Sequence, residues 1–109
     1  MGTVFISQDA EGRNFLPAAD YGRLQLILPA TAQVVLTARP ALGKLRYALR
    51  NFTDEDLLLL SGDPIIMALA VTVALNANMG RARLLKWDRF QKAYYEVAVD
   101  LNEVEDVVS

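Results

Sequence analysis

The segment 56–88 constrains the fold more than any other part of the chain. It contains a short apolar run (Leu57–Leu60), a tight turn (Gly62–Pro64), an apolar, alanine-rich run (Ile65–Asn78) and a second short run (Arg83–Trp87). Two parallel strands need a long crossover between them, usually a helix, whereas antiparallel strands can share a tight turn. The segment therefore predicts a βαβ unit, and with it an α/β fold.

Residue types at both ends of the long apolar run favour a helix. Asp63 can cap the first turn, and Pro64 suits the first helical position because its missing N–H has no partner there. The helix is expected to run to about Ala77, and Asn78-Met79-Gly80 is typical of a helix end. Val71-Thr72-Val73 favours a strand instead, so an extended segment is the alternative. Frequent alanine and the length of the run favour the helix.

The remaining strands are predicted from β-branched content and alternation. We expect strands at Thr3–Ser7, Arg23–Leu28 and Gln33–Ala38, the last two forming a hairpin. Over Tyr94–Leu101 apolar residues alternate with polar or small ones, which predicts a half-buried strand at or near a sheet edge. That strand should pair antiparallel with Arg83–Trp87, giving a C-terminal hairpin.

A second helix is predicted after Pro40. Apolar residues recur there at spacings of three or four and form one stripe, namely Leu42, Leu45, Leu49 and Phe52. Basic residues fall outside this stripe, namely Lys44, Arg46 and Arg50. The pattern indicates an amphipathic helix with a basic outer face.

These elements follow one another in the order β-β-β-α-β-α-β-β. We expect a single α/β (α+β) domain over residues 1–102, with one small mixed sheet of about five strands, two helices, one parallel βαβ unit and the C-terminal hairpin. Residues 103–109 are acidic and are expected to form a frayed tail.

Composition excludes several kinds of chemistry. The chain has 109 residues with no cysteine and no histidine, so disulfides, thiolate chemistry and Ser-His-Asp catalysis are excluded. We expect no cofactor, no metal and no enzymatic activity. The longest apolar run, Leu57–Leu75, is interrupted by Gly62-Asp63-Pro64 and is too broken to span a membrane. We expect a cytoplasmic protein that does not bind membranes.

An apolar surplus points to self-association. Apolar residues make up 53% of this short chain, which is high for a small soluble protein. The predicted long helix is apolar all round, and such a helix is either internal or covered by another protein. We expect a homo-oligomer, with a dimer favoured, that forms through this helix or through an exposed edge strand. The interface candidates on this helix are Ile66, Ala70, Val73, Ala74 and Ala77.

Two further surfaces are candidate binding sites. Basic residues and tryptophan near the terminal hairpin could hold single-stranded nucleic acid by stacking and charge neutralisation, although alternation divides them between two faces. These residues are Arg81, Arg83, Lys86, Trp87, Arg89 and Lys92. The turn Ser61-Gly62-Asp63 lies between a strand end and a helix start, where nucleotide or phosphate ligands bind in open α/β sheets. A structural helix cap is the alternative there.

The order of motifs along the chain resembles that of a family of small proteins from tailed bacteriophages. The resemblance is carried by Ser61-Gly62-Asp63-Pro64, Asn78-Met79-Gly80-Arg81, the run Leu84–Arg89 (LLKWDR) and Tyr94-Tyr95. It implies a phage origin and the cytoplasm of an infected bacterium, and it implies no activity. The leading hypothesis is a non-enzymatic interaction protein that self-associates, binds a host or phage protein, or does both. The alternatives are nucleic-acid binding at the hairpin and small-ligand binding at the turn.

Overall fold

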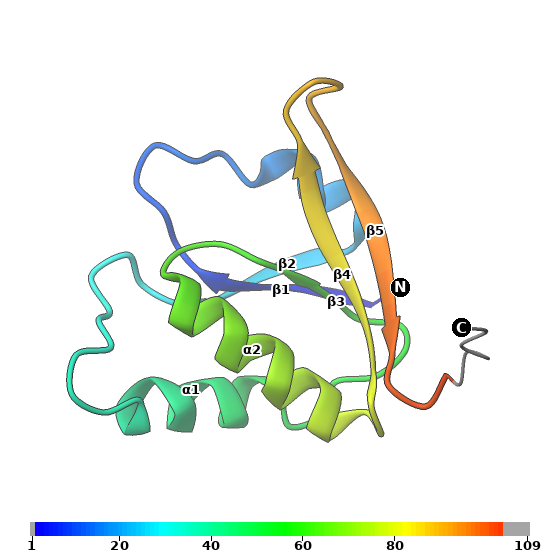
Figure 1. Cartoon of the computed structure of the whole chain (residues 1–109). Helices are drawn as coiled ribbons and strands as arrows, with labels where there is room; N and C mark the ends of the chain where they lie inside the picture. The colour runs from blue at the N-terminus through cyan, green and yellow to red at the C-terminus, as the bar shows by residue number, and fades with distance from the viewer. Residues whose placement is uncertain (1, 104–109) are drawn as a thin grey trace, which may run out of the picture.

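A computed structural model describes residues 2–103 and contains one five-stranded sheet with two α-helices (Figure 1). A short 3-10 helix, η1 (Leu16–Tyr21), lies between the first two strands of the sequence. The other elements are β1 (Thr3–Gln8), β2 (Arg23–Leu28), α1 (Arg39–Leu49), β3 (Leu57–Leu59), α2 (Pro64–Ala77), β4 (Arg81–Asp88) and β5 (Ala93–Asp100). The predicted tail beyond Glu103 lies outside the described residues.

The strands are ordered β2-β1-β3-β4-β5 across the sheet. β2, β1, β3 and β4 pair in parallel, and β5 pairs antiparallel with β4. The predicted βαβ unit is therefore confirmed, with α2 as the crossover between β3 and β4. The C-terminal hairpin and the mixed five-stranded sheet are confirmed as well.

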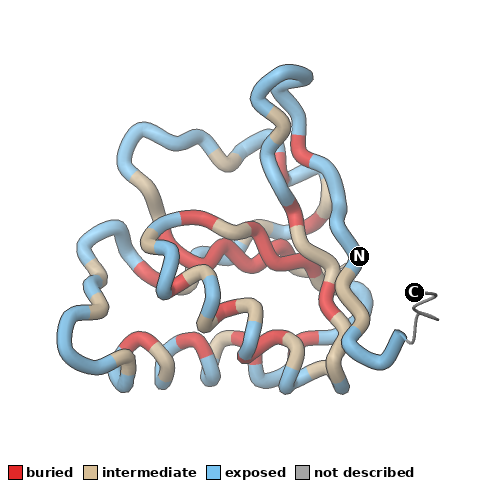
Figure 2. The backbone as a smooth tube through the Cα atoms, viewed as in Figure 1, coloured by how far each residue is buried: buried red, intermediate tan, exposed pale blue. Residues whose placement is uncertain are grey.

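The sheet divides the core into two unequal layers. Both α-helices pack on one face, where Leu45, Leu49 and Ile66 are fully buried. The other face is covered by η1, whose Ala18 packs with Val4 and Leu59. Figure 2 shows that burial is densest along the central strands and on the inner sides of the two helices. Within residues 2–103, no helix is long and apolar enough to cross a membrane.

Both ends of α2 follow the predicted signals. Asp63 is the N-cap, and its Oδ1 accepts a hydrogen bond of 2.7 Å from the Ile65 N–H. At the other end Met79 and Gly80 have φ values of 56° and 83°, and Gly80 N–H donates to the Leu75 carbonyl. These left-handed residues stop the helix and turn the chain into β4.

The predicted strand at Gln33–Ala38 is wrong, and with it the predicted hairpin. This segment is a loop between β2 and α1, and Val35 and Leu36 are 76% and 98% exposed. Since β2 pairs with β1 and leads into a helical crossover, the loop finds no neighbouring strand among the described residues. Val34 packs against the core and anchors it. β-branched composition alone does not make a strand when no partner edge is within reach.

The last strand is more exposed than alternation predicts. Of the residues in β5, Tyr94 alone is buried. The helix α2 lies over β1, β3 and β4, so β5 extends past the helical layer at the edge of the sheet (Figure 1). The predicted edge position is confirmed, but the strand is solvent-accessible on both faces along most of its length.

Candidate functional site

The ends of β1 and β3 mark the point where ligands bind in many open α/β sheets. From β1 the chain continues to β2 on one side, whereas from β3 it continues to β4 on the other side, which defines a topological switch point. Ser7 and Ser61 join the two strand ends. Ser7 Oγ donates to the Ser61 carbonyl at 2.6 Å, and Ser61 N–H donates back to Ser7 Oγ at 2.9 Å.

The side chain of Gln8 fills the space beside this junction. Gln8 is 3% exposed. Its Nε2 donates to the carbonyls of Pro29 and Ala32 at 3.1 and 2.9 Å. Its Oε1 accepts from the Asp63 N–H at 2.8 Å. Gln8 therefore ties the start of α2 to the loop after β2 from inside the switch point.

The predicted ligand residues Ser61, Gly62 and Asp63 lie together at this point. Gly62 has a φ of 95°, and a Cβ there would overlap the side chain of Gln8. The carboxylate of Asp63 caps α2, so it occupies a free amide and places negative charge where an anion would bind. Ser61 is 1% exposed, and its Oγ has no partner among the described residues. The arrangement performs the structural role of a turn and cap.

The predicted nucleic-acid residues do not form one surface. Side chains alternate along β4, so Arg81, Arg83 and Trp87 share one face and Lys86 lies on the other. Arg81 pairs with Asp54 and Arg83 with Glu96, each at 3.2 Å. The two basic residues at the root of the hairpin are thus neutralised by carboxylates of the same chain.

The remaining predicted nucleic-acid residues lie at the hairpin tip or near it. Arg89 and Lys92 are in the turn between β4 and β5. The Arg89 guanidinium lies 5.4 Å from the ring centre of Phe90, which is 86% exposed. Trp87 contacts Tyr94 edge to face, with ring centres 4.8 Å apart. This aromatic pair packs across the two strands and stiffens the hairpin.

Asp54 joins the end of α2 to the start of β4. Its Oδ1 accepts from Asn78 Nδ2 at 2.7 Å and from Arg81 Nε at 3.2 Å. The hydrogen bond from Asn78 lowers the pKa of Asp54 below its ordinary value, and the hydrogen bond and charge of Arg81 lower it further. Asp56 in turn accepts hydrogen bonds from the backbone N–H groups of Thr3 and Thr53. The acidic segment 54–56 therefore has a structural role in a turn. Among residues 2–103, no group of three or more acidic residues is arranged to hold a metal ion.

The predicted interface residues on α2 are mostly turned inward. Ile66, Ala70 and Ala74 are fully buried, and Val73 is 7% exposed, because α1 and the sheet cover this side of the helix. These four residues do not present a surface to a second copy, and that part of the prediction is wrong. Ala77, at the end of the helix, is exposed.

The outer edge of β5 is the exposed edge strand that was the alternative to the helix as a self-association surface. The Leu101 N–H donates to the Gly80 carbonyl at 2.8 Å. Along an antiparallel strand, successive residues direct their N–H and C=O groups alternately toward the paired strand and away from it. Because Leu101 is odd-numbered and bonds toward β4, the odd-numbered residues of β5 also bond to β4. The even-numbered residues direct their N–H and C=O groups away from the sheet, and in the described part of the chain no strand pairs with them.

Apolar side chains line one face of this free edge. Tyr95, Val97 and Leu101 are 41%, 38% and 67% exposed. They lie on the face that the helices cover elsewhere, because Val97 is paired with Leu84, which packs against the helical core. Exposure of large apolar residues beside unpaired backbone is typical of a strand that accepts another strand.

Comparisons with known proteins agree with the predicted phage resemblance. No curated protein and no solved structure matches the chain significantly. A family model, by contrast, matches residues 2–101, nearly the whole of the described chain. The chain belongs to the Phage Pam3 gp32-like protein family.

Proposed function

We propose that this phage-family protein is a non-enzymatic interaction protein that self-associates through the free edge of β5. We place it in the cytoplasm of the infected bacterium, where it would act on its own copies or on another phage or host protein. The proposal depends on one observation above all: within residues 2–103, β5 is an eight-residue edge strand whose outer backbone groups pair with no strand and whose apolar side chains are exposed. An edge of that kind readily templates pairing with another chain.

An antiparallel pair of β5 strands would be symmetric. Pairing centred on Val97 places Glu96 opposite Ala98 of the second copy, and both of these residues direct their backbone groups outward. On the apolar face, Val97 would meet Val97 of the second copy, and Tyr95 would meet Val99 of the second copy. Pairing centred on Glu96 or Ala98 is disfavoured, because it would place carboxylates opposite each other. The sheets of two subunits would then join into one, with the two-fold symmetry that is commonest among homodimers.

Charges on β5 support this register. Glu96 already pairs with Arg83 of its own chain at 3.2 Å, so its carboxylate is neutralised without a partner. Favourable cross-strand pairs contribute about 0.2–1 kcal/mol each relative to alanine pairs. The central Val97 pair and the two Tyr95–Val99 pairs thus supplement the backbone hydrogen bonds between the strands.

The test is the oligomeric state of Val97→Lys. A lysine at the centre of an edge strand opposes pairing, because the lysines of the two copies would face each other and their charges would repel. Val97 is exposed enough to accept a lysine without loss of folding. We expect light scattering after size exclusion at micromolar concentration to give a dimer for the wild type and a monomer for Val97→Lys. Val35→Lys is the matched control, since Val35 is an exposed valine in the loop after β2.

Two results would contradict the proposal. A wild-type chain that stays monomeric at micromolar concentration removes self-association. A dimer that survives Val97→Lys unchanged shows that copies associate through another surface.

A further inference from the structure

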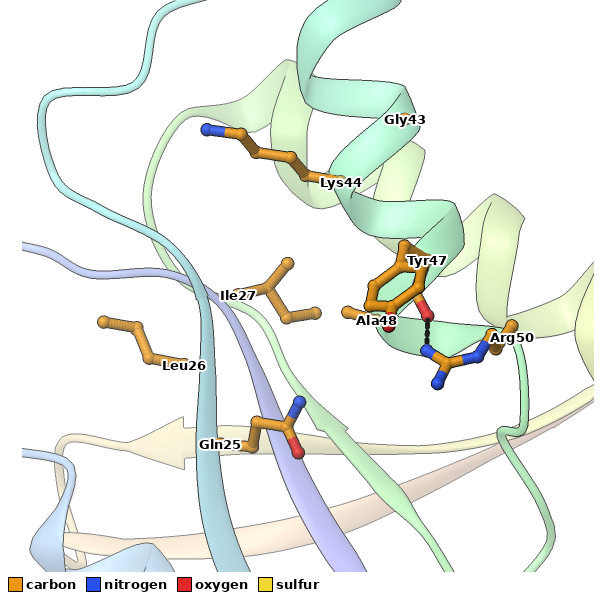
Figure 3. Close-up of a pocket in the computed structure, with 8 residues that line it drawn as sticks. All are labelled: Gln25, Leu26, Ile27, Gly43, Lys44, Tyr47, Ala48 and Arg50. Carbon is orange, nitrogen blue, oxygen red and sulfur yellow. Dashed lines mark hydrogen bonds between the residues drawn. The ribbon is translucent and has the colours of Figure 1, made fainter.

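The opposite edge of the sheet carries a groove between β2 and α1. It is a cavity of about 550 Å³. Figure 3 shows Ile27 and Ala48 pointing toward one another across its floor, with Lys44 reaching out from the helix. β2 is the other edge strand, and β1 is its only strand neighbour among residues 2–103. The groove therefore combines unpaired strand backbone with an apolar floor, which is the arrangement that accepts an added peptide strand.

One wall of the groove is kept open by glycine. Gly43 lies in α1, and a Cβ placed there would contact nothing within 4 Å. Gly costs about 1 kcal/mol relative to alanine inside a helix. Tyr47 is 70% exposed on the same wall, and the Arg50 guanidinium lies 4.0 Å from its ring centre.

Charge is strongly segregated toward this edge. The segment 21–53, which contains β2 and α1, has no acidic residue. It carries a formal charge of +5, so the remainder of the chain carries −7. Across residues 2–103, the salt bridges found are those of Arg81 and Arg83, and none involves the cations of this segment. These cations are Arg23, Arg39, Lys44, Arg46 and Arg50. The groove is therefore suited to an extended segment that is acidic as well as apolar.

The chain itself contains such a segment. Residues 103–108 read Glu-Val-Glu-Asp-Val-Val and supply three carboxylates and three β-branched residues. We propose that this acidic segment of a second copy docks as an added strand on β2, in the groove beside α1. In that extended form Val104, Asp106 and Val108 would share one face, which would place two valines toward the floor of the groove and the Asp106 carboxylate toward Lys44 and Arg50.

Reach favours a second copy over the same chain. β5 ends at Asp100, and four strand spacings separate it from β2. At about 4.8 Å each, these spacings amount to roughly 19 Å. Only Leu101 and Asn102 lie between β5 and the acidic segment, so the link from Asp100 to Glu103 spans at most roughly 10 Å when fully extended. The segment of the same chain is therefore too close to β5 to lie along β2.

A labelled peptide of residues 102–109 tests this docking directly. We expect it to bind the full-length chain in a fluorescence anisotropy titration at low salt, and to bind more weakly as salt rises. A control peptide with Gln at 103 and 105 and Asn at 106 should bind at least about fivefold more weakly, because it lacks the carboxylates.

Three protein variants locate the site. Lys44→Glu should weaken peptide binding by about fivefold to tenfold. Arg46→Glu is the matched control on the same helix, because Arg46 lines the separate groove between α1 and α2. It should have a clearly smaller effect. Gly43→Met should fill the cavity and abolish binding while its thermal unfolding temperature stays at or above that of the wild type.

The expected results differ from those that test the β5 edge. Val97→Lys should leave peptide binding unchanged, since Val97 lies at the far side of the sheet from β2. The proposal is overturned if the peptide shows no binding at millimolar concentration in low salt. Equal losses in Lys44→Glu and Arg46→Glu, or unchanged binding to Gly43→Met, would also overturn it, because either result means general charge attraction rather than docking in the groove.

Discussion

Replacing Gln8 by methionine tests how the switch point of the sheet is held. Methionine has a similar length and an apolar side chain, so it fills the same space without hydrogen bonds. The change removes two bonds to the carbonyls of Pro29 and Ala32 and one bond from the Asp63 N–H. A typical intramolecular hydrogen bond contributes about 1 kcal/mol net. The three bonds together give an expected loss of roughly 3 kcal/mol in the free energy of unfolding.

Thermal and urea unfolding measure this loss. In a domain of about 100 residues, 1 kcal/mol corresponds to about 4 °C or more, so the unfolding temperature should fall by roughly 12 °C. Gln8→Glu is the informative companion, because a carboxylate can accept from the Asp63 N–H but repels both carbonyls. It should be at least as destabilised as Gln8→Met at neutral pH and should recover as the carboxyl group is protonated in acid.

A small effect would refute the reasoning. If Gln8→Met loses less than about 0.5 kcal/mol, water replaces the three bonds and Gln8 does not fasten the loop to α2. A third variant of Gln8 addresses the ligand hypothesis. Gln8→Ala opens the switch point, and a nucleotide that stabilises this variant but not the wild type would show that Gln8 is what keeps ligands out.

Two further predictions concern the acidic side chains that join elements. Asp63→Ala should lower the free energy of unfolding by about 1 kcal/mol because the first turn of α2 loses its cap, and urea denaturation measures it; an unchanged midpoint would contradict the capping role. Asn78 and Arg81 lower the pKa of Asp54 in the folded chain. The ionised Asp54 carboxylate therefore stabilises the fold at pH values above its pKa in the unfolded chain, and this stabilisation is lost as the pH falls through the lower pKa of the folded chain. Asp54→Asn should therefore be less stable than the wild type at neutral pH, and the difference should shrink below about pH 3.8 in thermal unfolding scans; a difference independent of pH would contradict the pairing.

Patterns among residues close together in the sequence were enough to predict the ends of α2 and the buried side of α1. The cap at Asp63, the stop at Gly80 and the stripe of Leu45 and Leu49 are short-range patterns, and each matches the structure. The parallel crossover followed from the same signals, because a helix between two strands leaves few other arrangements.

Long-range pairing could not be predicted in the same way. Gln33–Ala38 has the composition of a strand, but it becomes a loop because β2 pairs with β1 on one side and has no described strand on the other. The helix α2 is apolar all round, and its sequence does not say which side faces the sheet. Burial of Ile66 and Ala70 depends on where α1 packs, and that is a property of the assembled fold.

The position of β1 between β2 and β3 also limits when the protein can fold. β1 precedes the other described strands along the chain, yet it becomes an interior strand, and its register places Val4 beside Leu57. One of its two sides thus stays without its partner until β3 has been synthesised. During that interval the nascent apolar strand is vulnerable to misassembly and to capture by chaperones.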